Sequence, residues 1–441
     1  SPRGARKQLI IGLDFGTAFT KVVISDGVAS MAVPLNGAGD SIDDYLLPST
    51  FWIGEYGITS ISRKTGTQIV DLKLALIKGI VSEDQLTRIA VFLAHALRRV
   101  RAFILDRKAS IYRGFYLDWL LNLGLPTDIY EDDELKAAYR KLGQVAWLAS
   151  TIEGDIVESA VRSMLRHGID QSDSHAASLE TDAISVFPEF VAQVTGYVRS
   201  PLRRSDLHLL VDVGAGTFDV TVFNVHERDD EDLFPIFAKS VKPLGTRFLV
   251  KYRLDNALGR KLKETGELGP YEAIPTSERF AGLLGLNKKD LAVIDRAFLS
   301  QVTGVVGELL RFTKARKYPM SRRWQDGVPL FLCGGGAKCD FYRDVLLGSG
   351  AVSGFEVRGA DLPKPEALEA PGVSEEDYDR LSVAYGLAFD PYDIGTTVAV
   401  DDIPINTPLS TPADGGICPS CDGNGGLHRP CGRCGGSGYL S

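Results

Sequence analysis

The sequence predicts an α/β protein with two similar lobes, each made of a sheet and helices, followed by a small C-terminal module that resembles a zinc ribbon. Three observations predict this fold. Two segments of the same design, about 200 residues apart, consist of a strand-like run, a glycine-containing turn and a second strand-like run. Helix-like and strand-like stretches alternate along the rest of the chain. Two pairs of cysteines lie close together near the C-terminal end.

Composition limits the class of protein. The 441 residues are enough for two or three domains. The formal net charge of -8 argues against general nucleic-acid binding. No apolar stretch approaches the roughly 20 residues that span a bilayer. The basic start of the chain leads directly into a strand-like run, without the separate apolar region of a signal peptide. We therefore expect a cytoplasmic protein that binds neither membranes nor nucleic acid.

The first element to justify is the second of the two repeated segments, LLVDVGAGTFDVTVFNV at residues 209–225. Its turn is too tight for bulky side chains, and glycine lets a backbone approach a ligand closely. Successive N–H groups in such a turn bind anions. Carboxylates repel phosphate, so Asp212 and Asp219 fit a site in which Mg²⁺ and its water molecules lie between them and the phosphate oxygens. The turn residues expected beside the phosphates are Gly214, Ala215, Gly216 and Thr217.

The segment LIIGLDFGTAFTKVVI, at residues 9–24, repeats this design. Asp14 ends its first apolar run, and Gly16, Thr17 and Ala18 form its turn. For one such segment alone, a simple hairpin with an acidic turn remains a sufficient explanation. Two copies indicate a duplicated lobe, and two hairpins that face each other would hold the phosphates of one nucleotide. We therefore expect ATP or ADP, with Mg²⁺, to bind between the lobes.

These motifs resemble those of the actin-like ATPase superfamily, and most closely the nucleotide-binding domain of DnaK-type heat-shock chaperones. IGLDFGTAFTKVVI is similar to the first phosphate motif of the family and LLVDVGAGTFDVTVF to the second. PLFLCGGGAKCDFYRDVL, at residues 329–346, resembles the adenosine motif. The resemblance covers about residues 8–392. It implies that further nucleotide contacts come from Gly334, Gly335, Gly336 and Lys338.

The resemblance also implies the catalytic residues. VFPEFVAQVTGYV, at residues 186–198, is similar to the first connecting helix of the family, whose acidic residue is here Glu189. DRLSVAYGLAF, at residues 379–389, resembles the second connecting helix. VDLKLALIKG resembles the stretch that carries the phosphate-contacting lysine, here Lys73. The implied catalytic set is Asp14, Lys73, Glu189, Asp212 and Asp219. Close crossing of the connecting helices is expected at Ala192, Thr195 and Gly196, because these side chains are small.

The sequence departs from the family pattern at several points. Ala18 stands where the family has a second threonine, and Lys338 stands where it has an arginine that stacks on the purine. The segment from about residue 245 to 325 is short and has no recognisable adenine clamp. These departures imply weaker nucleotide binding or a looser choice of purine. After Phe389 about fifty residues follow, too few for the peptide-binding sandwich domain of the chaperones.

The C-terminal segment carries two repeats of the pattern C-x-x-C-x-G-x-G, CPSCDGNG and CGRCGGSG. They resemble the zinc-binding repeats of DnaJ-type co-chaperones. Two thiolate pairs complete a tetrahedral site, and metal would supply the folding energy of a module too small to bury a core. We expect one structural Zn²⁺. Redox-active or idle thiol pairs remain an alternative, and His428 is a competing ligand. The expected ligands are Cys418, Cys421, Cys431 and Cys434.

Residues 82–107 predict an amphipathic helix. His95 is expected to pack within it, and Arg98, Arg99 and Arg101 are expected on a solvated face. The predicted domains are lobe I at residues 8–200 with an exchange subdomain at about 46–115, lobe II with the closing helix at 201–395, a linker at 396–416, and the zinc module at 417–441.

Three functional hypotheses follow. The first is a slow, Mg-ATP-dependent ATPase that works as a chaperone-type switch, lacks the sandwich domain, and recognises a protein partner or client through the zinc tail. The second is a filament-forming bacterial actin-like ATPase, because Lys21 resembles a lysine that several bacterial actin relatives carry. The third is a kinase of the same superfold. The partner, the pathway and the oligomeric state do not follow from the sequence.

Overall fold

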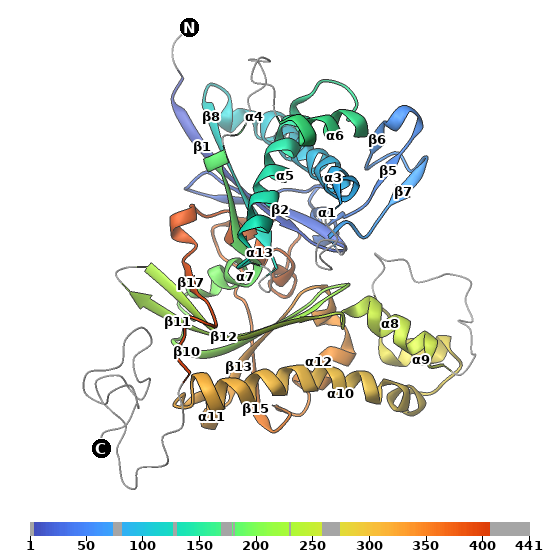
Figure 1. Ribbon diagram of the computed structural model, residues 1–441, viewed down its shortest axis with the longest axis vertical. Coiled ribbons are helices and arrows are strands. Elements are labelled where there is room, and N and C mark those ends of the chain that lie inside the picture. The colour runs from blue at the N-terminus through green and yellow to red at the C-terminus, as the bar shows by residue number, and fades with distance from the viewer. Residues whose placement is uncertain are drawn as a thin grey trace. The chain divides into compact units, whose positions relative to one another are not determined.

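Two mixed sheets organise the chain (Figure 1). The computed structural model describes residues 4–73, 82–126, 130–168, 179, 181–228, 231–257 and 274–405. The chain divides into a first unit, residues 1–201 with 362–394, and a second unit, residues 202–361 with 395–441. Each unit contains one of the two large sheets.

The sheet of the first unit has the strand order β16-β3-β2-β1-β8-β9, with β4 paired to β2. Strands β1, β2 and β3 are antiparallel in succession, and β8 and β9 continue the sheet parallel to β1. A separate small sheet has the order β6-β5-β7. The strands of this unit are β1 (Arg6–Phe15), β2 (Phe19–Ser25), β3 (Ser30–Ala32), β4 (Leu47–Pro48), β5 (Phe51–Ile53), β6 (Thr59–Ser60), β7 (Thr67–Ile69), β8 (Tyr116–Leu125), β9 (Ile184–Pro188) and β16 (Leu368–Glu369).

The sheet of the second unit has the order β14-β15-β13-β10-β11-β12-β17. Here β10, β11 and β12 are antiparallel in succession, and β13 and β15 continue the sheet parallel to β10. Its strands are β10 (Asp206–Val213), β11 (Phe218–Arg228), β12 (Glu231–Lys242), β13 (Val328–Cys333), β14 (Ala351–Val352), β15 (Phe355–Ala360) and β17 (Thr396–Val398).

The two sheets share one topology. In both, the order from one side is third, second, first, fourth and fifth main strand, with the same parallel and antiparallel relations. In both, a short strand from late in the chain extends the sheet parallel to the third strand, as β16 on β3 and β17 on β12. The predicted α/β class is confirmed, and the duplication inferred from the two hairpins extends to the whole sheets.

Helices α3 and α5 pack side by side in the first unit (Figure 1). Each begins at a capping residue, because Ser82 accepts a hydrogen bond from the Gln85 N–H and Asp132 accepts one from the Leu135 N–H. The apolar faces of both helices join the core of this unit. The helices of the unit are α1 (Ile42–Tyr45), α3 (Glu83–Ala102), α4 (Ala109–Tyr112), α5 (Asp133–Thr151), α6 (Glu158–His167), α7 (Glu189–Val198) and α13 (Ser382–Leu387).

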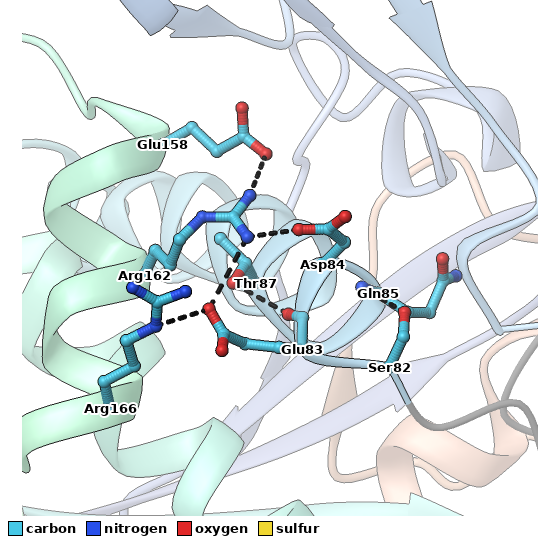
Figure 2. A network of polar contacts seen from close by, with 8 residues as sticks. All are labelled: Ser82, Glu83, Asp84, Gln85, Thr87, Glu158, Arg162 and Arg166. Carbon is cyan, nitrogen blue, oxygen red and sulfur yellow. Dashed lines mark hydrogen bonds and ion pairs between the residues drawn. The ribbon is translucent and has the colours of Figure 1, made fainter.

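Ion pairs fasten α6 to the first turn of α3. Figure 2 shows Arg162 and Arg166 reaching from α6 toward the acidic start of α3. Arg162 donates to Asp84 and, within its own helix, to Glu158, and Arg166 donates to Glu83. The acidic residues lie in the first turn of α3, where the helix dipole already favours negative charge.

The arginines of α3 do not form the solvated face that the sequence suggested. Arg98 donates to the carbonyl oxygens of Gly154 and Ile152 at 2.7 and 2.8 Å, and Arg101 donates to the Ser150 carbonyl at 2.9 Å. These carbonyls lie at or just after the end of α5, where a helix leaves its last carbonyls without partners. That expectation was wrong, because the acceptors lie about fifty residues away along the chain.

Helix α10 runs along one face of the second sheet (Figure 1). It begins at Asn287, which accepts hydrogen bonds from the N–H groups of Lys289 and Asp290. Its buried residues Phe298, Val302, Val306 and Leu310 follow one another at intervals of four and pack in the core of this unit. The helices of the unit are α8 (Thr246–Asp255), α9 (Ser277–Leu283), α10 (Lys288–Phe312), α11 (Arg323–Asp326) and α12 (Asp340–Leu346).

The two predicted connecting helices, α7 and α13, pack against each other within the first unit. A Cβ atom on Gly386 would lie 1.9 Å from the carbonyl oxygen of Ala192, so only glycine permits this approach. The close crossing expected at Ala192 is therefore present, and its decisive glycine is Gly386 of α13. The segment Leu362–Ile394, which carries α13, belongs to the first unit, whereas the predicted lobe II included it.

The first part of the predicted linker is packed against the second unit. Strand β17 pairs with β12, and the Lys317 ammonium donates to the carbonyl oxygens of Val400 and Ile403 at 2.8 and 2.7 Å. The Ile403 side chain is buried in the core of the unit. Residues 406–441, with the predicted zinc module, lie outside the described residues. Among the helices that are described, none is long and apolar enough to cross a bilayer.

We predict that acid weakens the first unit through His95. The Thr59 hydroxyl lies 2.8 Å from His95 Nε2 and donates to the Ile156 carbonyl at 2.7 Å. Burial, with Arg98 and Arg99 nearby, lowers the pKa of His95 to about 4. The unfolded imidazole binds a proton near pH 6.5, so the free energy of unfolding should fall between about pH 6.5 and 4, by at most about 3 kcal/mol. Urea denaturation across this range measures the fall.

The matched variants are His95→Gln, which removes the titrating group, and His167→Gln, which changes an exposed histidine at the end of α6. Only the first should reduce the dependence on pH. Part of it should persist, because burial also lowers the pKa of His208, in the second unit, to about 4. An unchanged pH dependence in His95→Gln would contradict the prediction.

Candidate functional site

The turn of the first hairpin is held in shape by Ser49, the residue after β4. The Ser49 N–H donates to the Ala18 carbonyl at 2.7 Å, and the Ser49 hydroxyl donates to the Gly16 carbonyl at 2.8 Å. The Thr20 hydroxyl lies 3.0 Å from that of Ser49. Gly16, Thr17 and Ala18 are half-buried. Since Ser49 uses two carbonyl groups of the turn, the backbone of residues 16–18 is fixed before any ligand binds.

Asp14 lies just before this turn and forms an ion pair with a lysine side chain. It is the cross-strand partner of Lys21, and its carboxylate lies 2.5 Å from the Lys21 ammonium. Both side chains are largely buried. An ion pair removed from water in this way is strengthened by the lower dielectric constant around it. In the first hairpin, the charge of the Asp14 carboxylate on β1 is therefore balanced by Lys21 on the adjacent strand β2.

Two further predicted catalytic residues meet in the same unit. Lys73 follows β7 and Glu189 opens α7, and their side chains form a hydrogen-bonded ion pair. Burial disfavours the charged form of Lys73, but attraction to Glu189, Tyr139 and Asp14 outweighs it and raises the pKa of Lys73. The ammonium is therefore charged throughout the physiological range. Asp14, Lys73 and Glu189, from three separate parts of the chain, are brought into one electrostatic cluster.

Tyr139 is a fourth member of this cluster that the sequence did not reveal. It lies on α5, it is buried, and its phenol interacts electrostatically with both Lys73 and Glu189. Burial raises the pKa of Tyr139, with opposing effects from Lys73 and Glu189, so the hydroxyl stays protonated. The only signal in the sequence was helical periodicity, which places Tyr139 on the same buried face as Leu142 and Ala146. That signal marks a core position and says nothing of chemistry.

The turn of the second hairpin is anchored by the start of α8. The Thr246 N–H donates to the Gly214 carbonyl at 3.0 Å and the Arg247 N–H to the Ala215 carbonyl at 2.9 Å. The turn closes on itself through a 2.9 Å bond from the Gly214 N–H to the Thr217 carbonyl. The first N–H groups of a helix have no partner within it, so the turn supplies partners that the helix needs.

The second hairpin differs from the first in its charge. Asp212 occupies the register position of Asp14, but its cross-strand partner is Asp219, where the first hairpin has Lys21. Directly opposed residues lie on one face of an antiparallel pair, and like charges there are destabilising. The Thr217 hydroxyl lies 3.5 Å from an Asp219 carboxylate oxygen. Two facing carboxylates are hard oxygen donors of the kind that suits Mg²⁺.

The predicted adenosine motif lies beside this pair. Strand β13 ends at Cys333, Gly334 turns the chain at a φ of 83°, and a short 3-10 turn over Gly335–Lys338 leads into α12. A Cβ on Gly334 would lie 2.2 Å from Asp212 Oδ1, so a side chain at this position would displace the carboxylate. Gly336 is buried, whereas Gly335 and Lys338 are exposed. The glycine turn and Asp212, distant in sequence, therefore lie together in the second unit.

The metal predictions have different outcomes. In the described part of the chain, no group of three or more histidine, cysteine or acidic side chains is arranged to hold a metal ion. Magnesium sites in phosphate enzymes use one or two carboxylates plus the phosphates, so this finding is compatible with Mg²⁺. The four cysteines expected to bind Zn²⁺, Cys418, Cys421, Cys431 and Cys434, lie outside the described residues, and their metal stays a prediction. Cys333 and Cys339 are buried free thiols.

Comparison with known proteins gives structural likenesses only. No protein-family model matches the sequence, and no curated protein matches it. Among solved structures, the chain is similar to MreB5 of Spiroplasma citri bound to ADP, with 13% identity, a TM-score of 0.45, and coverage of 86% of this chain and 94% of that one. It is also similar to a non-polymerisable quadruple mutant of pCBH ParM, with 12% identity, a TM-score of 0.47, and coverage of 86% and 98%. Neither likeness says what this chain binds or does.

We predict that Lys73 and Glu189 are energetically coupled. Lys73→Met or Glu189→Gln alone should destabilise the first unit by about 3 kcal/mol, because each removes one member of a largely buried ion pair and leaves the charge of the other. The double variant should recover most of this loss, since no uncompensated charge remains. Urea denaturation of the four proteins measures the coupling.

The same cycle on Arg6 and Asp118 is the control, because that ion pair is exposed and lies 3.5 Å apart. It should show little coupling. Additive losses in the Lys73 and Glu189 cycle would mean that the two side chains do not stabilise each other.

Proposed function

We propose that this chain is an ATPase of the actin-like superfamily that binds and hydrolyses Mg-ATP. The observation that carries the proposal is the duplication with its register: two sheets of the same topology each place an aspartate at the same point before a turn that contains glycine. A structural hairpin needs no such carboxylate. A site for a metal-bound polyphosphate needs one wherever the metal approaches.

Candidate residues in both units fit this substrate. The carboxylates of Asp14 and Asp212 are donors that Mg²⁺ prefers, and Asp14 already pairs with a cation. Bound Mg²⁺ neutralises negative charge on the phosphates. Lys73 supplies a buried positive charge for the terminal phosphate, and Glu189 keeps that lysine in position. Glu189 or Asp219 orients the attacking water. Phosphoryl transfer needs mainly positioning and charge stabilisation, and these residues supply both.

The finer hypotheses differ in what hydrolysis drives. Lys21, which motivated the filament-forming alternative, lies in the first hairpin and pairs with Asp14. This favours a filament-forming ATPase over the chaperone-type switch, whose support is the resemblance of the phosphate and adenosine motifs to those of DnaK-type chaperones. Recognition of a protein partner through the C-terminal cysteine repeats remains part of the proposal under either hypothesis, and so does the structural Zn²⁺.

We predict that Asp212→Asn lowers ATP turnover at least about tenfold, which corresponds to roughly 1.4 kcal/mol of barrier. The nucleotide-free protein should keep its stability, or gain some, because the substitution removes a like charge opposite Asp219. Phosphate release and thermal unfolding are the two measurements. Asp118→Asn, on an exposed carboxylate of β8, is the control and should change neither. Wild-type turnover in Asp212→Asn would refute the assignment of Asp212 to the nucleotide-binding site.

We predict that ATP turnover per molecule rises with protein concentration. In a filament-forming ATPase, assembly and hydrolysis are coupled, so the protein should also pellet in ATP and not in ADP. A chaperone-type switch acts as a single chain and should give a constant turnover per molecule with no pellet. Constant turnover per molecule over a wide range of protein concentration would therefore contradict the filament hypothesis and favour the chaperone-type switch.

A further inference from the structure

Tyr139 is buried with only 4% of its surface exposed, yet its hydroxyl has no hydrogen-bond partner in the described part of the chain. Burying a hydroxyl without a partner costs about 1 to 3 kcal/mol. A phenylalanine would fill the same space without that cost. A group that lowers stability in this way needs another reason to be present.

Three other buried tyrosines, Tyr45, Tyr112 and Tyr342, donate hydrogen bonds through their hydroxyls. Tyr45 donates to the Pro371 carbonyl at 2.8 Å, Tyr112 donates to Asp26 at 3.2 Å, and Tyr342 donates to the Leu244 carbonyl at 2.7 Å. Each of these bonds ties together segments that are distant in sequence. Tyr139 is equally buried but makes no such tie, so the role of these three hydroxyls does not account for its own.

The surroundings of Tyr139 identify the kind of ligand that its hydroxyl suits. Lys73 and Glu189 are its charged neighbours, and they are paired with each other. The Lys73 ammonium and the neutral Tyr139 hydroxyl, which interact electrostatically, are two kinds of donor for one acceptor. An anionic oxygen is the acceptor that both donors favour, and hydrogen bonds to a charged acceptor are stronger than those to a neutral one.

We propose that the Tyr139 hydroxyl donates a hydrogen bond to an oxygen of the terminal phosphate of ATP, beside Lys73. This inference rests on the proposed function and deepens it, because it adds a substrate-binding residue on α5. The hydroxyl then gains its partner only when a triphosphate is bound. A diphosphate lacks the group that it binds, so Tyr139 contributes to the preference for ATP over ADP.

The test is Tyr139→Phe, with Tyr112→Phe as the matched control. Affinities for a non-hydrolysable ATP analogue and for ADP are measured by calorimetry, and thermal unfolding is measured without nucleotide. Tyr139→Phe should weaken binding of the analogue about tenfold and leave ADP binding unchanged, since one hydrogen bond to a charged group is lost. Its unfolding midpoint should stay the same or rise. Tyr112→Phe should lower the midpoint and leave both affinities unchanged.

The outcomes separate this inference from the function on which it rests. If the wild-type chain binds neither nucleotide, the proposed function fails and this inference fails with it. If the wild-type chain binds both and Tyr139→Phe keeps the same ratio of affinities, only this inference is overturned. A Tyr139→Phe protein that is destabilised while its nucleotide affinities are intact would show a structural hydroxyl, and that result also overturns it.

Discussion

The carboxylate at the mouth of each hairpin is the constraint on which the rest of the arrangement depends. Asp14 and Asp212 occupy the same register in two sheets of the same topology, and Asp14 is buried whereas Asp212 is half-buried. The first sheet uses Lys21 as a cross-strand cation. The second sheet places Asp219 there, so no cation stands opposite Asp212 in the hairpin register. The duplicated fold thus has two electrostatically different halves.

In the cluster around Lys73, a buried charge is also balanced by an opposite charge, but here the partner comes from a distant segment of the chain. A buried lysine needs a partner, and Glu189 supplies it from the start of a helix, where a carboxylate is favoured. This pair joins the segment after β7 to α7. Helix α7 in turn depends on Gly386 for its contact with α13. Charge placement and close helix packing therefore stabilise the same region, and a change in one is expected to be felt in the other.

Local patterns predicted the hairpins, the start of α3 at Ser82 and the α/β class. These features could be predicted because strand periodicity, helix periodicity and helix capping each depend on residues that are close together in the sequence. Resemblance supplied Lys73 and Glu189, but their direct contact depends on tertiary folding. Tyr139 could not be predicted, because nothing local separates it from a core tyrosine. The arginines of α3 were misjudged because their partners are backbone carbonyls of distant segments, which leave no pattern in side chains. The packing of residues 396–405 was missed for a related reason, because their carbonyls accept from the distant Lys317.

The discontinuous first unit has a consequence for synthesis. Its sheet takes β16 from residues 368–369, and its β1 packs against α13, although all its other strands precede residue 189. Domains usually fold in the order in which the ribosome makes them. Here the first unit cannot be completed until every main strand of the second has left the ribosome. Its nascent form carries an uncovered strand edge at β3 and an uncovered glycine at Gly12 of β1, where α13 later packs. During translation, this edge and this glycine therefore stay uncovered until the last segment of the unit has been made.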